Sequence, residues 1–292
     1  MKLYAMAAIV LLFAPVLLAS VNKNVDNCFA DKNTNVVTKE TTEQTTEQTT
    51  NPLVFDFGHI KLDSVPNTSR DWYFIAKGDH TVPGVQTGID FKKYHTYYVG
   101  NTSKKTVYLT FDEGYENGYT PQILDTLKNR GVKAAFFCTG SYVKNNPELI
   151  KRMVNEGHIV ANHTLNHYHD ATLSEEAFKK ELTGVSDAYY SIIGENMPHF
   201  YRPPEGNYSE RTLAMASNFG YKTVFWSFAH RDWLTDMQPN PGDTLNRVVS
   251  SVHPGEIILL HAVSKSNTQA LGWIIDSLKN EGYEFLSLYE LD

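Results

Sequence analysis

From about residue 105 to the C-terminus, short apolar runs alternate with segments that carry helical signals. The apolar runs predict strands at 107–109, 134–138, 158–161, 199–202, 222–228, 257–260 and 283–288. These runs are continuously apolar, which is typical of strands buried on both faces of a parallel sheet. Such a sheet needs helices on its faces, and both a (β/α) barrel and a doubly wound sheet satisfy the pattern.

The segments between the strands begin and end with recognisable helix signals. Pro147 fits the first turn of one helix, and the residues TLSE (172–175) match a capping box. Glycines that can end a helix follow the predicted helices at 120–130, 147–156, 175–193, 209–219 and 268–280, and a further helix is expected at 244–252. No GxGxxG or GxxxxGK[ST] loop follows any strand, which disfavours a doubly wound nucleotide-binding fold.

The first hundred residues predict an exported protein. Residues 1–20 contain an apolar run suited to a signal peptide, with a retained N-terminal anchor as the alternative. Residues 21–51 include TTEQTTEQTT and predict a low-complexity linker, whereas 52–104 predict an N-terminal extension packed on a catalytic domain at 105–292. The net charge of −7 disfavours nucleic acid as a partner, and any membrane contact is expected only through the N-terminal segment.

Only two cysteines occur, Cys28 and Cys138. Cys138 lies in an apolar run and is expected to be a buried thiol rather than part of a disulfide framework.

Polar side chains follow five of the predicted strands. A lone histidine is usually structural, but in a (β/α) barrel functional residues gather at the C-terminal ends of the strands. The residues at these ends are Asp112 and Glu113, His163 and His167, Arg202, Asp232 and Trp233, and His261. Together they predict one active site.

His163 and His167 are four residues apart, so a helical turn would bring both imidazoles to one metal ion. A carboxylate from the expected turn at 112–113 would complete a set of two histidines and one acid, which leaves a coordination position open for water. Taken alone, the pair could equally be two polar loop residues.

Five motifs, in order, resemble those of the polysaccharide deacetylases, carbohydrate esterase family 4. They are TFDEG (110–114), HTLNH (163–167), RPPEG (202–206), Asp232-Trp233 and LLH (259–261), and the resemblance covers about residues 95–292. Within this family, YENGYT (115–120), SERTLA (209–214), FWS (225–227) and HAVS (261–264) resemble the δ-lactam-biosynthetic de-N-acetylases of spore-forming bacteria. The resemblance implies a distorted (β/α) barrel.

The resemblance also implies a role for each site residue. Asp112 would be the general base, oriented by Arg202, and His261 the general acid, tuned by Asp232. His163 and His167 would hold a divalent metal, with Zn²⁺ expected and Co²⁺, Mn²⁺ and Mg²⁺ as alternatives. Glu113 stands where the family usually has a metal-binding aspartate, so it is a candidate third ligand. Substrate contacts are expected from Tyr115, Pro204, Trp226 and Trp233.

The activity implied is removal of the acetyl group from N-acetylmuramic acid in peptidoglycan that a separate amidase has stripped of its stem peptides. The product would lead to muramic δ-lactam in the spore cortex and support germination. Deacetylation of N-acetylglucosamine in peptidoglycan or chitin-like glycans is the alternative, and a weakly active glycan-binding relative is another.

A different enzyme class, a non-haem iron oxygenase, could use His230, Asp232 and His261 as a facial triad. The βα alternation disfavours it, because such enzymes usually have an all-β fold. Choice between the possible glycans is expected to lie in the loops 52–104 and 229–243.

Overall fold

The computed structural model describes residues 55–85 and 88–291, so the predicted signal segment, the whole predicted linker and Cys28 lie outside the described residues. Its centre is an eight-stranded sheet. The strand order is β11 (Glu256–His261), β5 (Thr106–Glu113), β6 (Ala135–Cys138), β7 (Ile159–Asn162), β8 (Phe200–Tyr201), β10 (Lys222–Val224) and β4 (Thr96–Tyr97), with β12 (Glu284–Phe285) also paired to β5. Every pairing within this sheet is parallel, as the apolar runs predicted.

The sheet curls until its two ends approach each other. Phe228 forms an isolated parallel bridge to Ile258, and Val99 forms an antiparallel bridge to Glu256. Closure therefore depends on single bridges rather than on a continuous ladder. The result is a curled parallel sheet, close to the distorted barrel that was expected.

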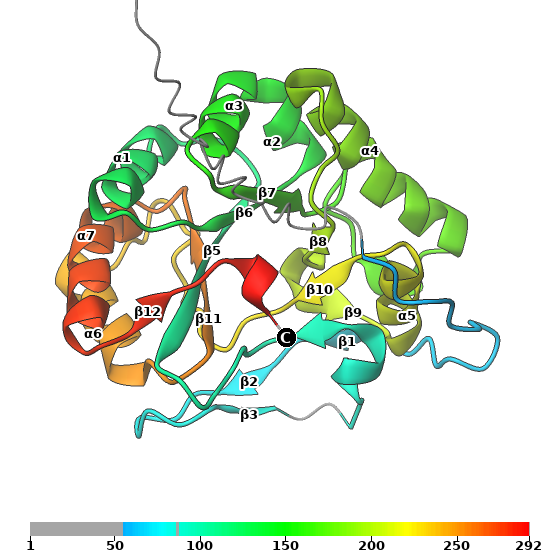
Figure 1. Ribbon diagram of the computed structural model, residues 1–292, viewed down its shortest axis with the longest axis horizontal. Coiled ribbons are helices and arrows are strands. Elements are labelled where there is room, and N and C mark those ends of the chain that lie inside the picture. Colours follow the sequence, from blue (N-terminus) through cyan, green and yellow to red (C-terminus); the bar gives the residue numbers. More distant parts are fainter. Residues whose placement is uncertain (1–54, 86–87, 292) are drawn as a thin grey trace, which may run out of the picture. The chain divides into compact units, whose positions relative to one another are not determined.

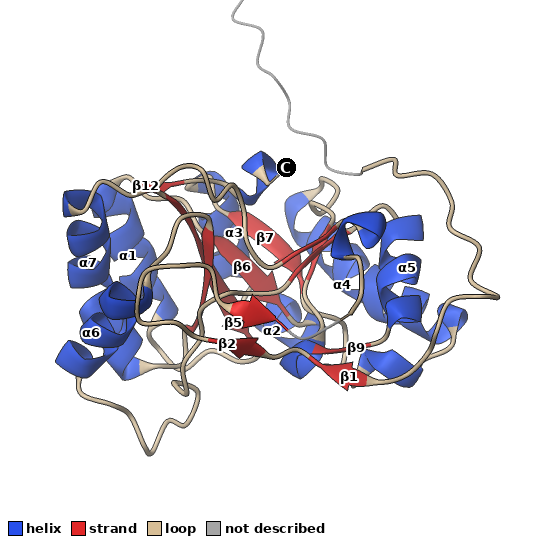
Figure 2. Cartoon of the chain, turned by 90° about the horizontal axis from the view of Figure 1, so that it is seen from below, coloured by secondary structure: helices blue, strands red, loops and turns tan. Residues whose placement is uncertain are grey.

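Helices cover the outside of the curled sheet, as Figures 1 and 2 show. They are α1 (Thr120–Arg130), α2 (Gly140–Asn145), α3 (Pro147–Asn155), α4 (Glu175–Ile193), α5 (Glu210–Asn218), α6 (Pro241–Ser251) and α7 (Lys265–Asn280). The short 3₁₀ turns are η1 (Phe91–Tyr94), η2 (Asp170–Thr172), η3 (Pro204–Gly206) and η4 (Leu288–Glu290). Among the helices in the described part of the chain, none is long and apolar enough to cross a bilayer.

Local signals placed some helix ends correctly and others wrongly. Helix α1 has the predicted bounds, because Gly131 takes the left-handed conformation (φ 62°) that ends it. The predicted capping box at 172–175 is wrong, because Ser174 caps α4 by accepting the Ala177 N–H. Helix α2 was not expected, although Thr139 caps it through its side chain.

Strand lengths differ from expectation at two places that matter for function. β5 continues past residue 109 to Glu113, so the expected turn at 112–113 is wrong. β10 ends at Val224, because residues 225–228 leave it and cross to β11, where Leu259 N–H bonds to the Phe228 carbonyl.

Part of the predicted N-terminal extension contributes to the sheet and its core. Residues 96–97 form β4, which pairs with β10. Trp72 stacks on Phe225 with ring centroids 4.6 Å apart. The extension also forms short antiparallel ladders: β1 (Arg70–Asp71) pairs with β9 (Asn207–Tyr208), and β2 (Phe74–Ile75) pairs with β3 (Gly84–Val85). The buried Cys138 is a free thiol, as expected.

Candidate active site

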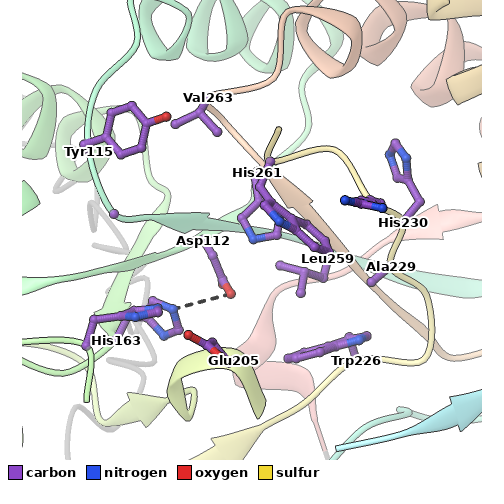
Figure 3. A pocket seen from close by; sticks show the side chains of 14 residues that line it. Asp112, Tyr115, His163, Glu205, Trp226, Ala229, His230, Leu259, His261 and Val263 are labelled. Atoms are coloured by element: carbon purple, nitrogen blue, oxygen red, sulfur yellow. Dashed lines mark ion pairs between the residues drawn. The ribbon is translucent and has the colours of Figure 1, made fainter. Parts of the chain in front are cut away.

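A cavity of about 780 Å³ opens at the C-terminal ends of β5, β7 and β11 (Figure 3). Its lining includes many of the residues expected there: Asp112, Tyr115, His163, His167, Trp226, Trp233 and His261. The remaining four candidates, Arg202, Asp232, Glu113 and Pro204, do not line it.

The register of the sheet brings Asp112 and His261 together. β5 and β11 are neighbouring parallel strands, and Asp112 is paired with His261 in their ladder. Neighbouring strands lie roughly 4.8 Å apart, so the two side chains face the same cavity from adjacent positions. This pairing connects residues that are 149 positions apart in the chain.

Arg202 fixes the orientation of Asp112 from behind the cavity. Its Nη1 donates to Asp112 Oδ1 at 2.7 Å, and its Nη2 donates to Thr110 Oγ1 at 2.9 Å. Its Nε donates to the carbonyl of Val224 at 2.9 Å, and the whole side chain is buried. Thr110 lies two residues before Asp112, so both side chains point to the same face of β5.

These contacts decide the charge of Asp112. Burial raises the pKa of its carboxyl, but the charge of Arg202, together with smaller electrostatic contributions from His163 and His261, lowers it by more. The net pKa lies below the ordinary value for an aspartate, so Asp112 is ionised at neutral pH and can accept a proton.

His261 is held by Asp232. Its Nδ1 donates to Asp232 Oδ1 at 2.7 Å, and its backbone N–H donates to Asp232 Oδ2 at 2.9 Å. Asn267 also donates to this fully buried carboxylate. Burial lowers the pKa of His261, but the Asp232 charge raises it by more, so its net pKa lies above the ordinary value. Since Nδ1 is occupied, Nε2 is the nitrogen left to exchange a proton with a bound molecule.

His163 and His167 converge without the helical turn that was expected. The loop after β7 is irregular, and Thr164 (φ 66°) and His167 (φ 58°) adopt left-handed conformations that are uncommon for side chains of these types. The imidazole centroids lie 4.9 Å apart. Glu181 holds this loop by accepting from the backbone and side-chain amides of Asn166.

His163 is in the form that binds a metal. Its Nδ1 donates to the Arg202 carbonyl at 2.9 Å, so Nε2 carries the lone pair, 3.6 Å from Asp112 Oδ2 (Figure 3). Burial is the main cause that lowers the pKa of His163 to about 4, so the ring is neutral at physiological pH. The two imidazoles therefore fit a divalent metal of the kind that prefers nitrogen ligands.

Glu113 is not brought to these histidines. Since β5 is extended through Glu113, the side chain lies on the opposite face from Asp112. It is fully buried, and neither carboxylate oxygen has a hydrogen-bond partner in the described part of the chain. Burial, followed by the charges of Glu116 and Asp112, raises its pKa well above the ordinary value. Among residues 55–85 and 88–291, no three His, Cys, Asp or Glu side chains form a ready metal-binding group.

This geometry predicts that Glu113→Gln leaves metal affinity within about threefold of wild type. By contrast, His163→Ala is expected to lower it by about 10- to 100-fold, because removing a ligand costs at least as much as removing the group that orients one. Competition with a chromogenic chelator, using Zn²⁺ and Co²⁺, would measure both. An equal loss in the two variants would restore Glu113 as a ligand.

Aromatic side chains surround the mouth of the cavity. Tyr115 and Trp233 are 55% and 48% exposed, and the Trp233 ring lies 5.5 Å from that of His261. Such rings can stack on the apolar face of a sugar. Pro204 does not contribute, because it is buried in η3, and its neighbour Glu205 lines the cavity instead.

Several lining or supporting residues were missed by sequence reasoning. They are Thr110, Glu205, Arg231 and Asn267. Thr110 and Glu205 belong to the motifs TFDEG and RPPEG, and Arg231 directly precedes Asp232. Their positions could have singled them out, whereas Asn267 is identified only by its contacts.

The facial-triad alternative does not fit the geometry. His230 Nε2 is 3.1 Å from Asn267 Oδ1, and both oxygens of Asp232 are taken by His261 and Asn267. The curled parallel sheet also differs from the all-β fold usual in such oxygenases.

The chain is similar to known proteins over most of its length. The family described as polysaccharide deacetylase matches residues 99–224. The peptidoglycan-N-acetylmuramic acid deacetylase PdaA of Bacillus subtilis is 42% identical over 236 residues, which cover 80% of this chain and 90% of that protein. A peptidoglycan-N-acetylglucosamine deacetylase of Bacillus cereus is 36% identical over 205 residues, covering 68% and 92%. The solved structure of PdaA, described as a family 4 carbohydrate esterase, matches with a TM-score of 0.76 over 78% of this chain and 98% of that one.

Proposed function

Since this chain belongs to the polysaccharide deacetylases, carbohydrate esterase family 4, we propose that it removes the acetyl group from N-acetylmuramic acid in peptidoglycan. The observation that carries the proposal is the pairing of Asp112 with His261 across β5 and β11. The pKa of the Asp112 carboxyl is lowered and that of the His261 imidazole is raised, which favours the ionised carboxylate and the protonated imidazole that amide hydrolysis requires. The 42% identity to PdaA over most of both chains supports muramic acid as the sugar.

In the proposed reaction, Asp112 accepts a proton from the water that attacks the acetamide carbonyl carbon. The attack gives a tetrahedral oxyanion, and His261 Nε2 then donates a proton to the amide nitrogen. The carbon–nitrogen bond breaks, acetate leaves and the sugar keeps a free amine. Arg202 holds Asp112 in place, and Asp232 holds His261.

His163 and His167 would hold the divalent metal that the family implies. Zn²⁺ suits two imidazoles best, with Co²⁺, Mn²⁺ and Mg²⁺ as alternatives. When bound, the ion would lower the pKa of water and stabilise negative charge on the carbonyl oxygen. The Arg202 carbonyl prepares the site by fixing His163 with Nε2 free.

The product is expected to cyclise. The new amine at C2 and the lactyl carboxyl on O3 of the same sugar can form a six-membered lactam with loss of water. We place the enzyme outside the cytoplasm, on the cell wall or spore cortex, after an amidase that removes stem peptides, and supporting germination. This location agrees with the export predicted from residues 1–20.

Incubation with peptidoglycan stripped of stem peptides tests the proposal. Acetate release would be measured, and mass spectrometry of the fragments would identify the deacetylated sugar. Muramic acid without its acetyl group, or its δ-lactam, is the expected product. Deacetylated glucosamine instead would favour the second candidate, which the Bacillus cereus relative supports.

The Asp232–His261 pair predicts a specific change in pH dependence. His261 must be protonated to act, so activity is full below its raised pKa and is lost as pH rises through it. Asp112 must be ionised, and because its pKa is lowered, the acid limb of the pH–activity profile lies at low pH. Asp232→Asn removes the charge that raises the pKa of His261, so the alkaline limb of kcat/KM is expected to move down by about one pH unit or more.

Asp236→Asn is the matched control for this experiment. Asp236 is an exposed acid in the same loop, four residues after Asp232, and it does not line the cavity. Its replacement is expected to leave the profile unchanged. An alkaline limb that stays in place in Asp232→Asn would contradict the role given to this pair.

A further inference from the structure

Arg231 lines the cavity as a cation that has no partner among the described residues. It is the only lysine or arginine among the described residues that line the cavity, and within the described chain no hydrogen bond or ion pair is found for its exposed side chain. The mechanism above does not use it. A guanidinium left free beside a reaction centre is a candidate for binding an anion in the substrate.

The backbone that carries Arg231 is fixed on both sides. His230 is held to Asn267, and Asp232 is held to the backbone and ring of His261. Arg231 therefore extends from a segment that is attached directly to the proposed general acid. Its own side chain stays free to meet a ligand.

The negative charges of the cavity do not neutralise Arg231. Asp112 is paired with Arg202, and Glu205 lies 3.1 Å from His169. In Figure 3, Glu205 lies near His163, whereas His230, the neighbour of Arg231, lies on the other side of the view. An anion entering the cavity would meet Arg231 with no carboxylate of the described residues already bound to it.

N-acetylmuramic acid carries such an anion and N-acetylglucosamine does not. The two sugars differ by a lactyl ether on O3, one ring position from the acetamide at C2. The lactyl carboxyl is a free carboxylate only when the stem peptide is absent, because in intact peptidoglycan it forms the amide that joins peptide to sugar. A cation near His261 could therefore detect both the sugar and the loss of its peptide.

We propose that Arg231 binds the lactyl carboxylate and so selects peptide-free muramic acid. The inference rests on the proposed function and adds to it the residue that determines specificity. Two parallel N–H donors of a guanidinium match the two oxygens of a carboxylate, and such bidentate pairs are stronger than neutral hydrogen bonds. Arg231 is a specificity residue and takes no part in proton transfer.

The test combines a protein variant with a chemical change of the substrate. Arg231→Gln, Arg231→Lys and the control Lys265→Gln would be assayed on peptide-stripped peptidoglycan and on the same material after its carboxyls are coupled to methylamine. Lys265 is an exposed cation four residues after His261 that does not line the cavity, so its replacement controls for net charge. Far-UV circular dichroism would check that each variant is folded.

Arg231→Gln is expected to raise KM on the native substrate by about 10- to 100-fold with little change in kcat, because the contact exists before and during the reaction. Wild type on the methylamidated substrate should show the same loss, and Arg231→Gln should not distinguish the two substrates. Arg231→Lys should keep part of the preference, and Lys265→Gln all of it.

Two failures can be told apart. If wild type releases no acetate from muramic acid, the proposed function fails and the inference falls with it. If wild type is active but methylamidation changes its KM less than twofold, or Arg231→Gln retains the wild-type preference, the role of Arg231 is overturned and the proposed function stands. The methylamidation result does not depend on any variant folding.

Discussion

Asp112→Asn is expected to lower acetate release by about 10³- to 10⁴-fold, the upper part of the range for losing a positioned general base. The amide keeps nearly the same shape but cannot accept the proton of the attacking water. The effect should fall on kcat, since the proton moves only in the transition state. Initial rates of acetate formation over a range of substrate concentrations would separate kcat from KM.

The protein is expected to stay folded after this change. Arg202 is fully buried and would lose a charged partner, but it keeps hydrogen bonds to Thr110, Val224 and Phe225, and the new amide oxygen still accepts. We expect the free energy of unfolding to fall by about 1–3 kcal/mol, the cost of weakening one buried hydrogen bond to a charged group.

Asp125→Asn provides the control for Asp112→Asn. Asp125 is an exposed acid on α1 that pairs with Arg152 and lies outside the cavity. Its replacement should leave both kcat and the denaturation midpoint nearly unchanged. Near wild-type kcat in a folded Asp112→Asn variant would remove Asp112 from the role of base.

His261→Ala is expected to lower hydrolysis of the acetamide by about 10²- to 10⁴-fold, because an amine is a poor leaving group until it is protonated. An aryl acetate ester with a nitrophenolate leaving group does not need that proton. The same variant should therefore hydrolyse the ester at a rate within a few-fold of wild type. Asp112→Asn, which lacks the base for the first step, should lose both activities.

The contrast between amide and ester separates an acid from a residue that merely supports the site. Asp232 stays hydrogen-bonded in His261→Ala, because the Asn267 amide and the backbone N–H of residue 261 still donate to it. Collapse of the site should thus be limited. If His261→Ala loses ester and amide hydrolysis equally, His261 is not acting only as the acid.

The sequence alone determined the class of fold. Short continuous apolar runs are typical of strands buried inside a sheet covered on both faces, and this is a property of each run by itself. Helix ends were predictable where one residue decides them, as Gly131 does for α1. The motif residues Asp112, His163 and His261 could be assigned to one site because parallel strands share a C-terminal edge.

Tertiary structure decided how those residues cooperate. Asp112 and Glu113 look equivalent in the sequence, but β5 stays extended through both, so one faces the cavity and the other the buried opposite face. Whether a strand continues from residue 109 to residue 113 depends on its neighbours, and β6 pairs with Glu113 through Cys138. Likewise, long-range packing sets the strand register that places His261 beside Asp112. It also sets the chain path that leaves Arg231 without a partner among the described residues, and no local pattern encodes either result.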